Sequence, residues 1–319
     1  MINLDYNTLP LESLGPTVLT IGNFDGVHRG HQELIRTIVH ESKNPKLTSV
    51  ILTFYPHPVT YFLPKEKIHV ICSRNYKEKL IAKLGVDAIL TLSFDEKLAN
   101  LTPEEYVKQI LIDKLNVNTI WVGYDFTFGK NRKGNVRSLI EIGEKSGFKT
   151  RILSPQRDHD IVISSTKIRE LLLEGSVDEA NHYLNRVHII SGLIVSGDAK
   201  GRILGYPTIN VNVKEGLIPG HGIYSGVVEI ESEMYPTAIY IGRRPTFQDS
   251  DLRVEAHIIG FQGNLYHTDI SIGFLNYLRP DTKFDNEHQL IKAIEKDCSN
   301  TQTDFDLWQS RPDSPSFIP

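Results

Sequence analysis

The stretch TVLTIGNFDGVHRGH occupies residues 17–31. Its apolar run Val18–Ile21 predicts a buried strand, and a turn containing three glycines leads into a helix predicted over His31–Ile38. A strand, a glycine-rich turn and a helix are typical of the first unit of an open α/β sheet, in which ligands bind at the carboxyl ends of the strands. The glycines let the backbone approach a phosphate, and the helix start offers N–H groups and a positive dipole end.

Two histidines lie in this turn, His28 and His31, three positions apart. That spacing places both imidazoles on one side of the helix start, where both can donate hydrogen bonds to the same anion. A single histidine here would be interpreted as a surface or capping residue. The pair, with Gly30 between them in a glycine-rich first turn, predicts a phosphate-handling site instead.

The pattern of the chain changes near residue 185. Before it, short β-branched runs alternate with longer helical stretches, which predicts a parallel sheet with helices on both faces. After it, short alternating strands come at intervals marked by turns, which is typical of an antiparallel barrel or sandwich. We therefore predict two domains, 1–185 and 186–319. A helix over Asn286–Asp297 is expected to end the second, followed by a poorly ordered polar tail from Ser299.

Composition narrows the class of protein. The 319 residues are 40% hydrophobic and 23% charged, with a formal net charge of -4. This acidic balance argues against a nucleic-acid partner, and no apolar run reaches the length of a membrane span. Only two cysteines occur, so a disulfide framework is not expected and a reducing, cytoplasmic location fits. We see no signal peptide at the start and no signal for an oligomeric state.

Several motifs resemble, in one order along nearly the whole chain, those of bacterial bifunctional riboflavin kinases/FAD synthetases. The HRGH segment (28–31) is similar to the HxGH box of nucleotidyltransferases. The other motifs, in chain order, are LTFYPHP (52–58), GYDFTFG (123–129), ISSTKIRELL (163–172), GDAKGRILGYPTIN (197–210), GIYSG (222–226), IGRRPTF (241–247) and VEAHI (254–258). The resemblance implies a Rossmann-like nucleotidyltransferase domain followed by a riboflavin kinase barrel.

For the first domain, the resemblance implies adenylyl transfer from ATP to FMN, with release of pyrophosphate. Its catalytic residues would be His28, His31 and Arg169. Its ATP site would also include Gly22, Asn23, Phe24, Asp25, Gly26, Ser165, Thr166 and Lys167. The hydroxyls and cations of the SSTKIR segment would face the phosphates, although Ser-Ser-Thr is also a good helix cap. The flavin side would be His57, Pro58, Phe62, Asp125, Thr127 and Phe128.

For the second domain, the resemblance implies phosphorylation of riboflavin by ATP. The ATP-binding residues would be Gly197, Lys200, Gly201, Gly205, Pro207, Thr208 and Asn210. Thr208 and Asn210 lie two apart on a predicted strand and so face the same way, and their oxygens suit Mg²⁺. Glu255 interrupts a strand between Val254 and Ala256 and matches the family's general base for the riboflavin 5′-hydroxyl.

The chain departs from the family's usual pattern at three places. Tyr240 replaces a small polar residue before Ile241-Gly242, His267 follows Leu-Tyr where glycine is common, and Leu184–Val187 lacks the usual glycine. None of them is expected to touch the proposed catalytic atoms.

The sequence therefore predicts a two-domain cytoplasmic enzyme that makes FMN and then FAD, with riboflavin, FMN and ATP as substrates and Mg²⁺ as cofactor. The main alternative is an FAD synthetase with a non-catalytic kinase-like barrel. A non-catalytic flavin-sensing regulator would need neither HxGH nor a base. A relative of the aminoacyl-tRNA synthetases, which also carry HxGH, is disfavoured by the acidic balance.

Overall fold

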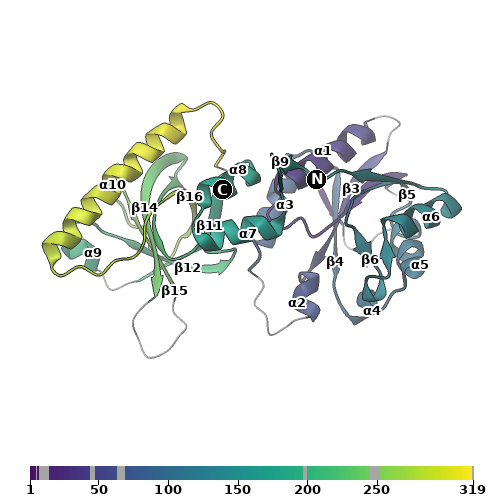
Figure 1. Ribbon diagram of the computed structural model, residues 1–319, viewed down its shortest axis with the longest axis horizontal. Coiled ribbons are helices and arrows are strands. Elements are labelled where there is room, and N and C mark those ends of the chain that lie inside the picture. Colours follow the sequence, from purple (N-terminus) through teal and green to yellow (C-terminus); the bar gives the residue numbers. More distant parts are fainter. Residues whose placement is uncertain are drawn as a thin grey trace. The chain divides into compact units, whose positions relative to one another are not determined.

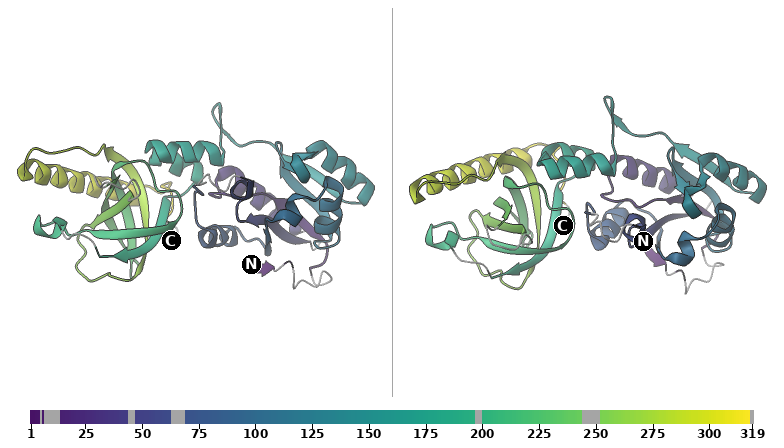
Figure 2. Two further views of the ribbon diagram at one scale, coloured as in Figure 1. Left: turned by 90° about the horizontal axis from the view of Figure 1, so that it is seen from below. Right: turned by 60° about the horizontal axis from the view of Figure 1, so that its bottom comes forward.

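The computed structural model describes residues 1–4, 6, 14–43, 47–62, 69–196, 200–243 and 252–317 (Figures 1 and 2). The chain divides into two units, which are described separately. The first contains Met1–Ile68 and Arg74–Ser164, and the second contains His69–Ser73 and Ser165–Pro319. Among the described residues, no helix combines the length and apolar character needed to cross a membrane.

Six parallel strands form the sheet of the first unit, in the spatial order β1-β4-β3-β2-β5-β8. Their bounds are β1 Ile2–Leu4, β2 Thr17–Ile21, β3 Thr48–Tyr55, β4 Ala88–Ser93, β5 Val117–Gly123 and β8 Lys149–Leu153. Every residue of β2 is buried, as expected for a central strand with both faces covered. The chain runs from β2 outward to β3 and β4, then returns to β5 on the other side of β2. The carboxyl end of β2 is therefore the switch point of the sheet, where such folds bind ligands.

Helices cover both faces of this sheet. On one face, Tyr106, Ile110 and Leu139 pack into a core cluster with alternate residues of β2 to β5. Tyr106 and Ile110 come from one helix, which begins as α5 (Pro103–Tyr106) and continues as the π-helical η2 (Val107–Ile112). Leu139 comes from α6 (Val136–Ser146). Helix α1 (Arg29–Ser42) contacts β2 and β3, and right-handed crossovers place it and α3 (Arg74–Lys83) on the opposite face. The shorter elements are α2 Pro58–Phe62, α4 Glu96–Ala99, β6 Thr127–Phe128, η3 Lys130–Arg132, β7 Gly134–Asn135, β9 Arg157–Asp158 and β10 Ile161–Val162.

The second unit is built on a closed barrel with the strand order β11-β12-β15-β14-β13-β16. All its pairings are antiparallel. The strands are β11 His188–Val195, β12 Ile209–Glu215, β13 Gly222–Ile230, β14 Glu233–Arg243, β15 Leu252–Ile258 and β16 Asp269–Arg279. The helices are α7 Ser165–Glu174, α8 Val177–Leu184, α9 Lys200–Ile203 and α10 Glu287–Ser310. Helix α10 runs along the outside of the barrel against β13, β14 and β16 (Figure 2).

The predicted fold class is confirmed in both halves, but the expected poorly ordered tail is wrong. Helix α10 continues through Ser299 and ends at Ser310. Thr301 and Phe305 of its second half are buried, and the indole of Trp308 donates to the carbonyl of Pro315 at 2.7 Å. These contacts order a segment whose polar composition suggests disorder. Only about one side chain per helical turn is buried, so the mean composition of the segment stays polar.

Candidate functional site: a histidine turn in the sheet unit and a strand face of the barrel

The turn after β2 is fixed by hydrogen bonds with the neighbouring strand β3 and with helix α3. The Gly22 N–H donates to the carbonyl of Leu52 on β3 at 3.1 Å. The ammonium of Lys77, from α3, donates to the carbonyl of Asn23 and to Thr53 Oγ1, each at 3.1 Å. Lys77 could not be predicted from the sequence, since a lone lysine in a helix gives no local signal of such a role.

The next four residues of the turn, Phe24 to Val27, are all buried. Phe24, Gly26 and Val27 all have positive φ values, of 49°, 79° and 41°. This backbone conformation is uncommon for residues other than glycine, and such strain collects at functional sites. The turn is therefore held in a shape that the surrounding structure imposes.

His28 and His31 stack at the start of α1. Their ring centroids are 3.6 Å apart and their planes 20° apart, and the edge of Phe24 packs against His31. His28 is the N-cap of the helix, and its Nδ1 accepts a hydrogen bond from the backbone N–H of His31 at 3.4 Å. An accepting Nδ1 places the ring proton of neutral His28 on Nε2. The predicted proximity of the two imidazoles is present in the structure.

Gly30 leaves the space that the His28 ring needs. A Cβ at this position would lie 3.2 Å from Cε1 and 3.3 Å from Nδ1 of His28. These distances are tighter than ordinary carbon contacts, so a side chain here would displace the imidazole. Packing against the His28 ring therefore explains why a glycine occupies this position of the HxGH box in this chain.

The SSTKIR residues begin a different element. Ser165 is the first residue of α7, which belongs to the second unit. Ser165, Lys167 and Arg169 are half-buried and Thr166 is exposed. The role of these four residues toward ATP stays a prediction from sequence.

The predicted flavin residues fall into two groups. His57, Pro58 and Phe62 lie at the carboxyl end of β3, where Phe62 is 59% exposed and packs edge-on against Phe94. Phe94 also contacts Phe54 and Tyr61, so four aromatic rings gather there. In the second group, Asp125 lies in the turn after β5 and Thr127 begins β6, and both are exposed. Phe128 instead stacks on Phe126 inside the core cluster, where it contributes packing.

In the barrel, Asn210 and Glu255 are direct partners. Asn210 on β12 lies opposite Glu255 on β15 in the strand register, so their side chains share one face. The neighbours of Glu255 along the strand, Val254 and Ala256, are buried in the barrel. Because strand residues alternate between faces, Glu255 and Asn210 point away from the interior. Thr208 precedes β12 by one residue and is half-buried.

Two residues beside Glu255 were not foreseen. Arg253 donates from Nη1 to Glu255 Oε1 at 3.1 Å, and both side chains are about one quarter exposed. Tyr240 on β14 is the other register partner of Glu255. Tyr240 therefore lies on the strand next to Glu255, although its printed hydrogen bond goes to Asp281. No local pattern in the sequence reveals this neighbour, because it depends on the register of β14 with β15.

The glycine-rich segment before β12 is described from residue 200 onward, and Gly197 lies outside the described residues. Lys200 and Gly201 belong to the short helix α9. Gly205 has a φ of +87°. The carbonyl of Pro207 accepts a hydrogen bond from His257 Nδ1 at 2.7 Å, which joins this segment to β15.

The chemistry of these barrel side chains fits a magnesium ion held partly by substrate. The described residues contain no group of three or more His, Cys, Asp or Glu side chains that could hold a metal ion. Neutral hydroxyl and amide oxygens, such as those of Thr208 and Asn210, are hard ligands. They suit Mg²⁺ that is shared with nucleotide phosphates rather than caged by protein.

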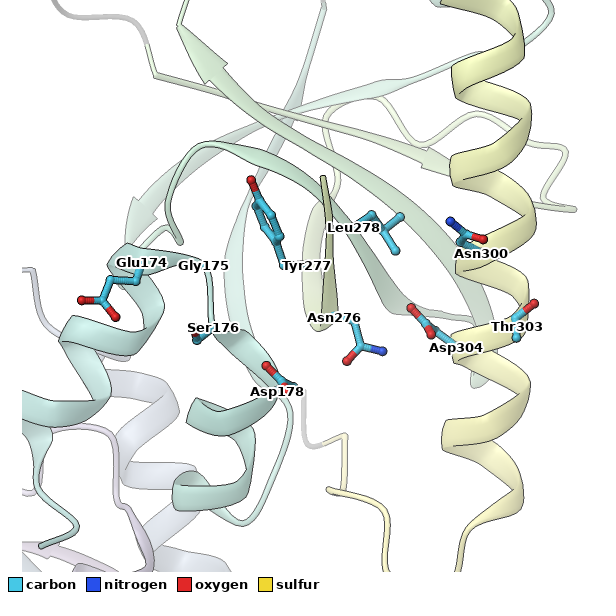
Figure 3. A pocket seen from close by; sticks show the side chains of 10 residues that line it. All are labelled: Glu174, Gly175, Ser176, Asp178, Asn276, Tyr277, Leu278, Asn300, Thr303 and Asp304. Atoms are coloured by element: carbon cyan, nitrogen blue, oxygen red, sulfur yellow. The ribbon is translucent and has the colours of Figure 1, made fainter. Parts of the chain in front are cut away.

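A cavity of about 480 Å³ lies elsewhere in the second unit (Figure 3). It opens between the α7–α8 turn, the end of β16 and the second half of α10. It contains none of the predicted site residues. Its lining consists of Glu174, Gly175, Ser176, Asp178, Asn276, Tyr277, Leu278, Asn300, Thr303 and Asp304.

Comparison with known proteins identifies both halves. The family model for FAD synthetase matches residues 11–167, and the one for riboflavin kinase matches residues 184–305. A bifunctional riboflavin kinase/FMN adenylyltransferase of Buchnera aphidicola is 33% identical over 295 residues, which cover 91% of this chain and 95% of the relative. The proteins of the same description from Bacillus subtilis and Escherichia coli K12 are 32% and 31% identical, and cover 90% and 91% of this chain and 92% and 93% of their own lengths.

A solved structure shares the whole fold. It is a Streptococcus pneumoniae protein described as a macrolide-efflux protein, with a TM-score of 0.85 and 30% identity. The match covers 95% of this chain and 99% of that one. With two family models in tandem and bifunctional relatives matched over most of their length, this chain belongs to the family of bifunctional riboflavin kinases/FMN adenylyltransferases.

Proposed function

We propose that the two reactions of this family are divided along the chain, with adenylyl transfer in residues 1–185 and riboflavin phosphorylation in residues 186–319. The second reaction would supply the FMN that the first consumes. ATP is the co-substrate of both. The proposal places both reactions in the cytoplasm, where ATP is abundant and where the free thiols of Cys72 and Cys298 stay reduced.

In the adenylyl transfer, an FMN phosphate oxygen attacks the α-phosphorus of ATP and pyrophosphate leaves. The reaction needs positioning and charge stabilisation rather than covalent help from the protein. His28 and His31 would donate hydrogen bonds to phosphate oxygens as negative charge builds up, and the tautomer of His28 is set by its capping bond. Ser165, Thr166, Lys167 and Arg169 would bind the pyrophosphate side.

For the flavin of this reaction, we propose the carboxyl ends of β3 and β5. The exposed ring of Phe62, in its aromatic cluster with Phe94, offers an apolar face to the isoalloxazine. Asp125 and Thr127 would supply polar contacts from the turn after β5, and His57 and Pro58 would shape the wall after β3.

In the riboflavin kinase reaction, the 5′-hydroxyl oxygen attacks the γ-phosphorus of ATP and ADP leaves. Glu255 would accept the hydroxyl proton. Arg253 holds Oε1 of that carboxylate and so would present Oε2 to the hydroxyl. Thr208 and Asn210 would hold Mg²⁺, which neutralises charge on the nucleotide phosphates. The segment from Gly197 through Lys200, Gly201, Gly205 and Pro207 would cover those phosphates.

The observation that carries the proposal is the register pairing of Asn210 with Glu255. It supports a working kinase over the alternative of an FAD synthetase with a non-catalytic barrel, because the proposed metal ligand and the proposed base lie side by side on one strand face. A barrel kept only for structure has no need of a carboxylate and an amide in that arrangement.

The test is to incubate the protein with riboflavin, Mg²⁺ and ATP labelled at either the α- or the γ-phosphorus, and to separate the flavins. The γ-label should enter FMN and FAD, whereas the α-label should enter FAD alone. FAD formed from supplied FMN, with no FMN formed from riboflavin, would overturn the kinase half and leave the alternative.

A further inference from the structure

Three side chains form a row across neighbouring strands of the barrel. Asn210 on β12 is paired with Glu255 on β15, which is paired in turn with Tyr240 on β14. Ile239 and Ile241, on either side of Tyr240, are fully buried. The row therefore lies on the outer face, with Asn210 at one end, Tyr240 at the other and Glu255 between them.

The phenol of Tyr240 lies along this face toward Arg253. A Cβ at Gly242 would overlap the phenol, so the ring lies over that glycine. Gly242 is the register partner of Arg253, whose guanidinium holds Glu255. Tyr240 thus lies along the same face as the Arg253–Glu255 ion pair.

The hydroxyl of Tyr240 is anchored beyond the barrel. It donates to Asp281 Oδ2 at 3.0 Å. Burial, followed by the hydrogen bond to Asp281 and the charges of Asp281 and Glu255, raises the pKa of Tyr240 to about 12.

Asp281 belongs to residues 280–286, which connect β16 to α10 and are called the connector below. The base of the connector is attached to α10, since Arg279 makes a two-pronged ion pair with Asp297, at 2.7 to 3.2 Å. The same guanidinium lies over the ring of Phe284, 5.5 Å from its centroid. The bond from Tyr240 attaches the connector to the strand face that carries Glu255.

The order of the row separates the two substrates of the kinase reaction. This inference rests on the proposed function, in which Asn210 binds Mg²⁺. The metal and the nucleotide therefore lie on the Asn210 side of Glu255. The acceptor hydroxyl must reach the γ-phosphorus from the side opposite the leaving group, because the attacking and leaving oxygens are roughly in line. Riboflavin therefore approaches from the Tyr240 side, where the connector lies.

We propose that Tyr240 is a positioning residue for riboflavin: through its hydrogen bond to Asp281 it holds the connector as a wall on the acceptor side of Glu255. Tyr240 acts through the connector and takes no part in proton transfer. Its loss therefore weakens riboflavin binding and leaves the chemical step and the ATP site unchanged.

The test uses Tyr240→Phe in the full-length protein. Removing a hydrogen bond to a charged acceptor should raise KM for riboflavin about tenfold, with kcat and KM for ATP within about twofold of the wild-type values. Tyr235→Phe is the matched control, because Tyr235 lies on the same strand and donates to a carboxylate, Glu233, at 2.7 Å. That control should leave KM for riboflavin unchanged.

Asp281 supplies the second arm. Asp281→Ala should reproduce the Tyr240→Phe effect, and the double variant should be no worse than either single variant, because both remove the same bond. Asp281→Asn keeps an accepting oxygen and should retain near-normal KM. Additive effects, an unchanged KM in Tyr240→Phe, or a fall in kcat alone would each overturn the proposal.

Two measurements do not depend on turnover. Riboflavin binding, followed by flavin fluorescence with ADP and Mg²⁺ present, should weaken in Tyr240→Phe but not in Tyr235→Phe. Amide hydrogen exchange in residues 280–286 should accelerate in the same variant. Wild-type protein without kinase activity would overturn the proposed function, whereas unchanged exchange and binding in Tyr240→Phe would overturn this inference by itself.

Discussion

The imidazoles of His28 and His31 stack with their centroids 3.6 Å apart, at the carboxyl end of the central strand of the sheet. One ring caps α1 and the other is carried on its first turn. Two donors with this separation can bind oxygens of one polyphosphate at the positive end of the helix dipole. The shape of the turn therefore sets the positions of both proposed phosphate-binding imidazoles.

His31→Ala should lower FAD formation from FMN and ATP by roughly 10²–10³-fold, the usual cost of losing one donor to developing charge. Riboflavin phosphorylation should stay within about twofold. His40→Ala, an exposed histidine of the same helix, is the control and should leave both reactions unchanged. His28→Asn keeps a capping oxygen and should separate the catalytic loss from loss of the cap. FAD synthesis that survives His31→Ala within a few-fold would refute the assignment.

Gly30→Ala tests the space beneath His28. Gly30 is the second residue of α1 and has no positive φ, so alanine can adopt its backbone conformation and the variant should unfold at about the same urea concentration as the parent. The added methyl group meets the His28 ring at 3.2 Å and should shift it by a few tenths of an ångström, which lowers FAD formation by up to roughly tenfold. The combination of unchanged stability and reduced activity is the expected result. Unchanged FAD formation would show that the position of the His28 ring is not critical.

Features set by local pattern were predictable. The β2–α1 unit follows from a buried apolar run, a glycine turn and a helix, and the histidine pair follows from a three-residue spacing. The barrel strands follow from alternation, whereas β1 and β8, the two edge strands of the parallel sheet, were not predicted. Helix α8 was also missed, since only the structure shows how Asn181 and Tyr183 are buried.

Features set by pairing between distant segments were not predictable. Tyr240 and Asn210 both meet Glu255 through strand register, which depends on how whole strands align. The hydrogen bond from Tyr240 to Asp281 spans 41 positions of sequence. One residue of slip would turn each of these side chains to the opposite face, so composition and spacing alone leave them undetermined.

A fragment of residues 165–319 should fold and phosphorylate riboflavin better than a fragment of residues 186–319. The buried Asn181 side chain donates to the carbonyl of Phe274 at 2.8 Å and accepts from the His188 N–H at 2.6 Å. Removing α8 removes both hydrogen bonds and leaves water as the partner of the two backbone groups, at a net cost of roughly 0.5–1.5 kcal/mol each. Urea unfolding of the two fragments, followed by circular dichroism, measures the difference. Equal stability would show that the barrel does not depend on α7 and α8.

The buried His188 should make the barrel acid-sensitive. Burial, with a smaller contribution from Arg186, lowers the pKa of His188 to about 4, against a hydrogen bond to the Leu217 carbonyl that raises it. Between about pH 6.5 and 4 the unfolded chain binds a proton at this position that the folded barrel does not. His188 therefore has no effect on the pH dependence of stability above pH 6.5. Between pH 6.5 and about 4 it lowers the free energy of unfolding, by about 3 kcal/mol in total.

Trp308 lies in this unit and Trp121 in the other. In a Trp121→Phe background, tryptophan fluorescence therefore follows the urea unfolding of the barrel unit alone, from pH 7 to 4.5. His188→Gln retains a donor for the Leu217 carbonyl but cannot take up a proton. Its stability should fall less steeply with acid than that of the parent. Parallel curves for the two proteins would mean that other groups produce the acid sensitivity.

Glu255→Gln should abolish most of the riboflavin kinase reaction and leave FAD synthesis from supplied FMN intact. The amide preserves the shape and hydrogen-bonding reach of the side chain, but it cannot accept the proton of the 5′-hydroxyl. A general base is worth roughly 10²–10⁴-fold, with the lower end expected if the phosphoryl-transfer transition state is loose.

Glu229→Gln, a half-buried glutamate on β13, is the matched control and should retain both activities. Measuring the two half-reactions separately distinguishes the outcomes. Normal kinase turnover would make Glu255 a solvent-facing strand residue, and loss of both activities would mean that it holds the fold.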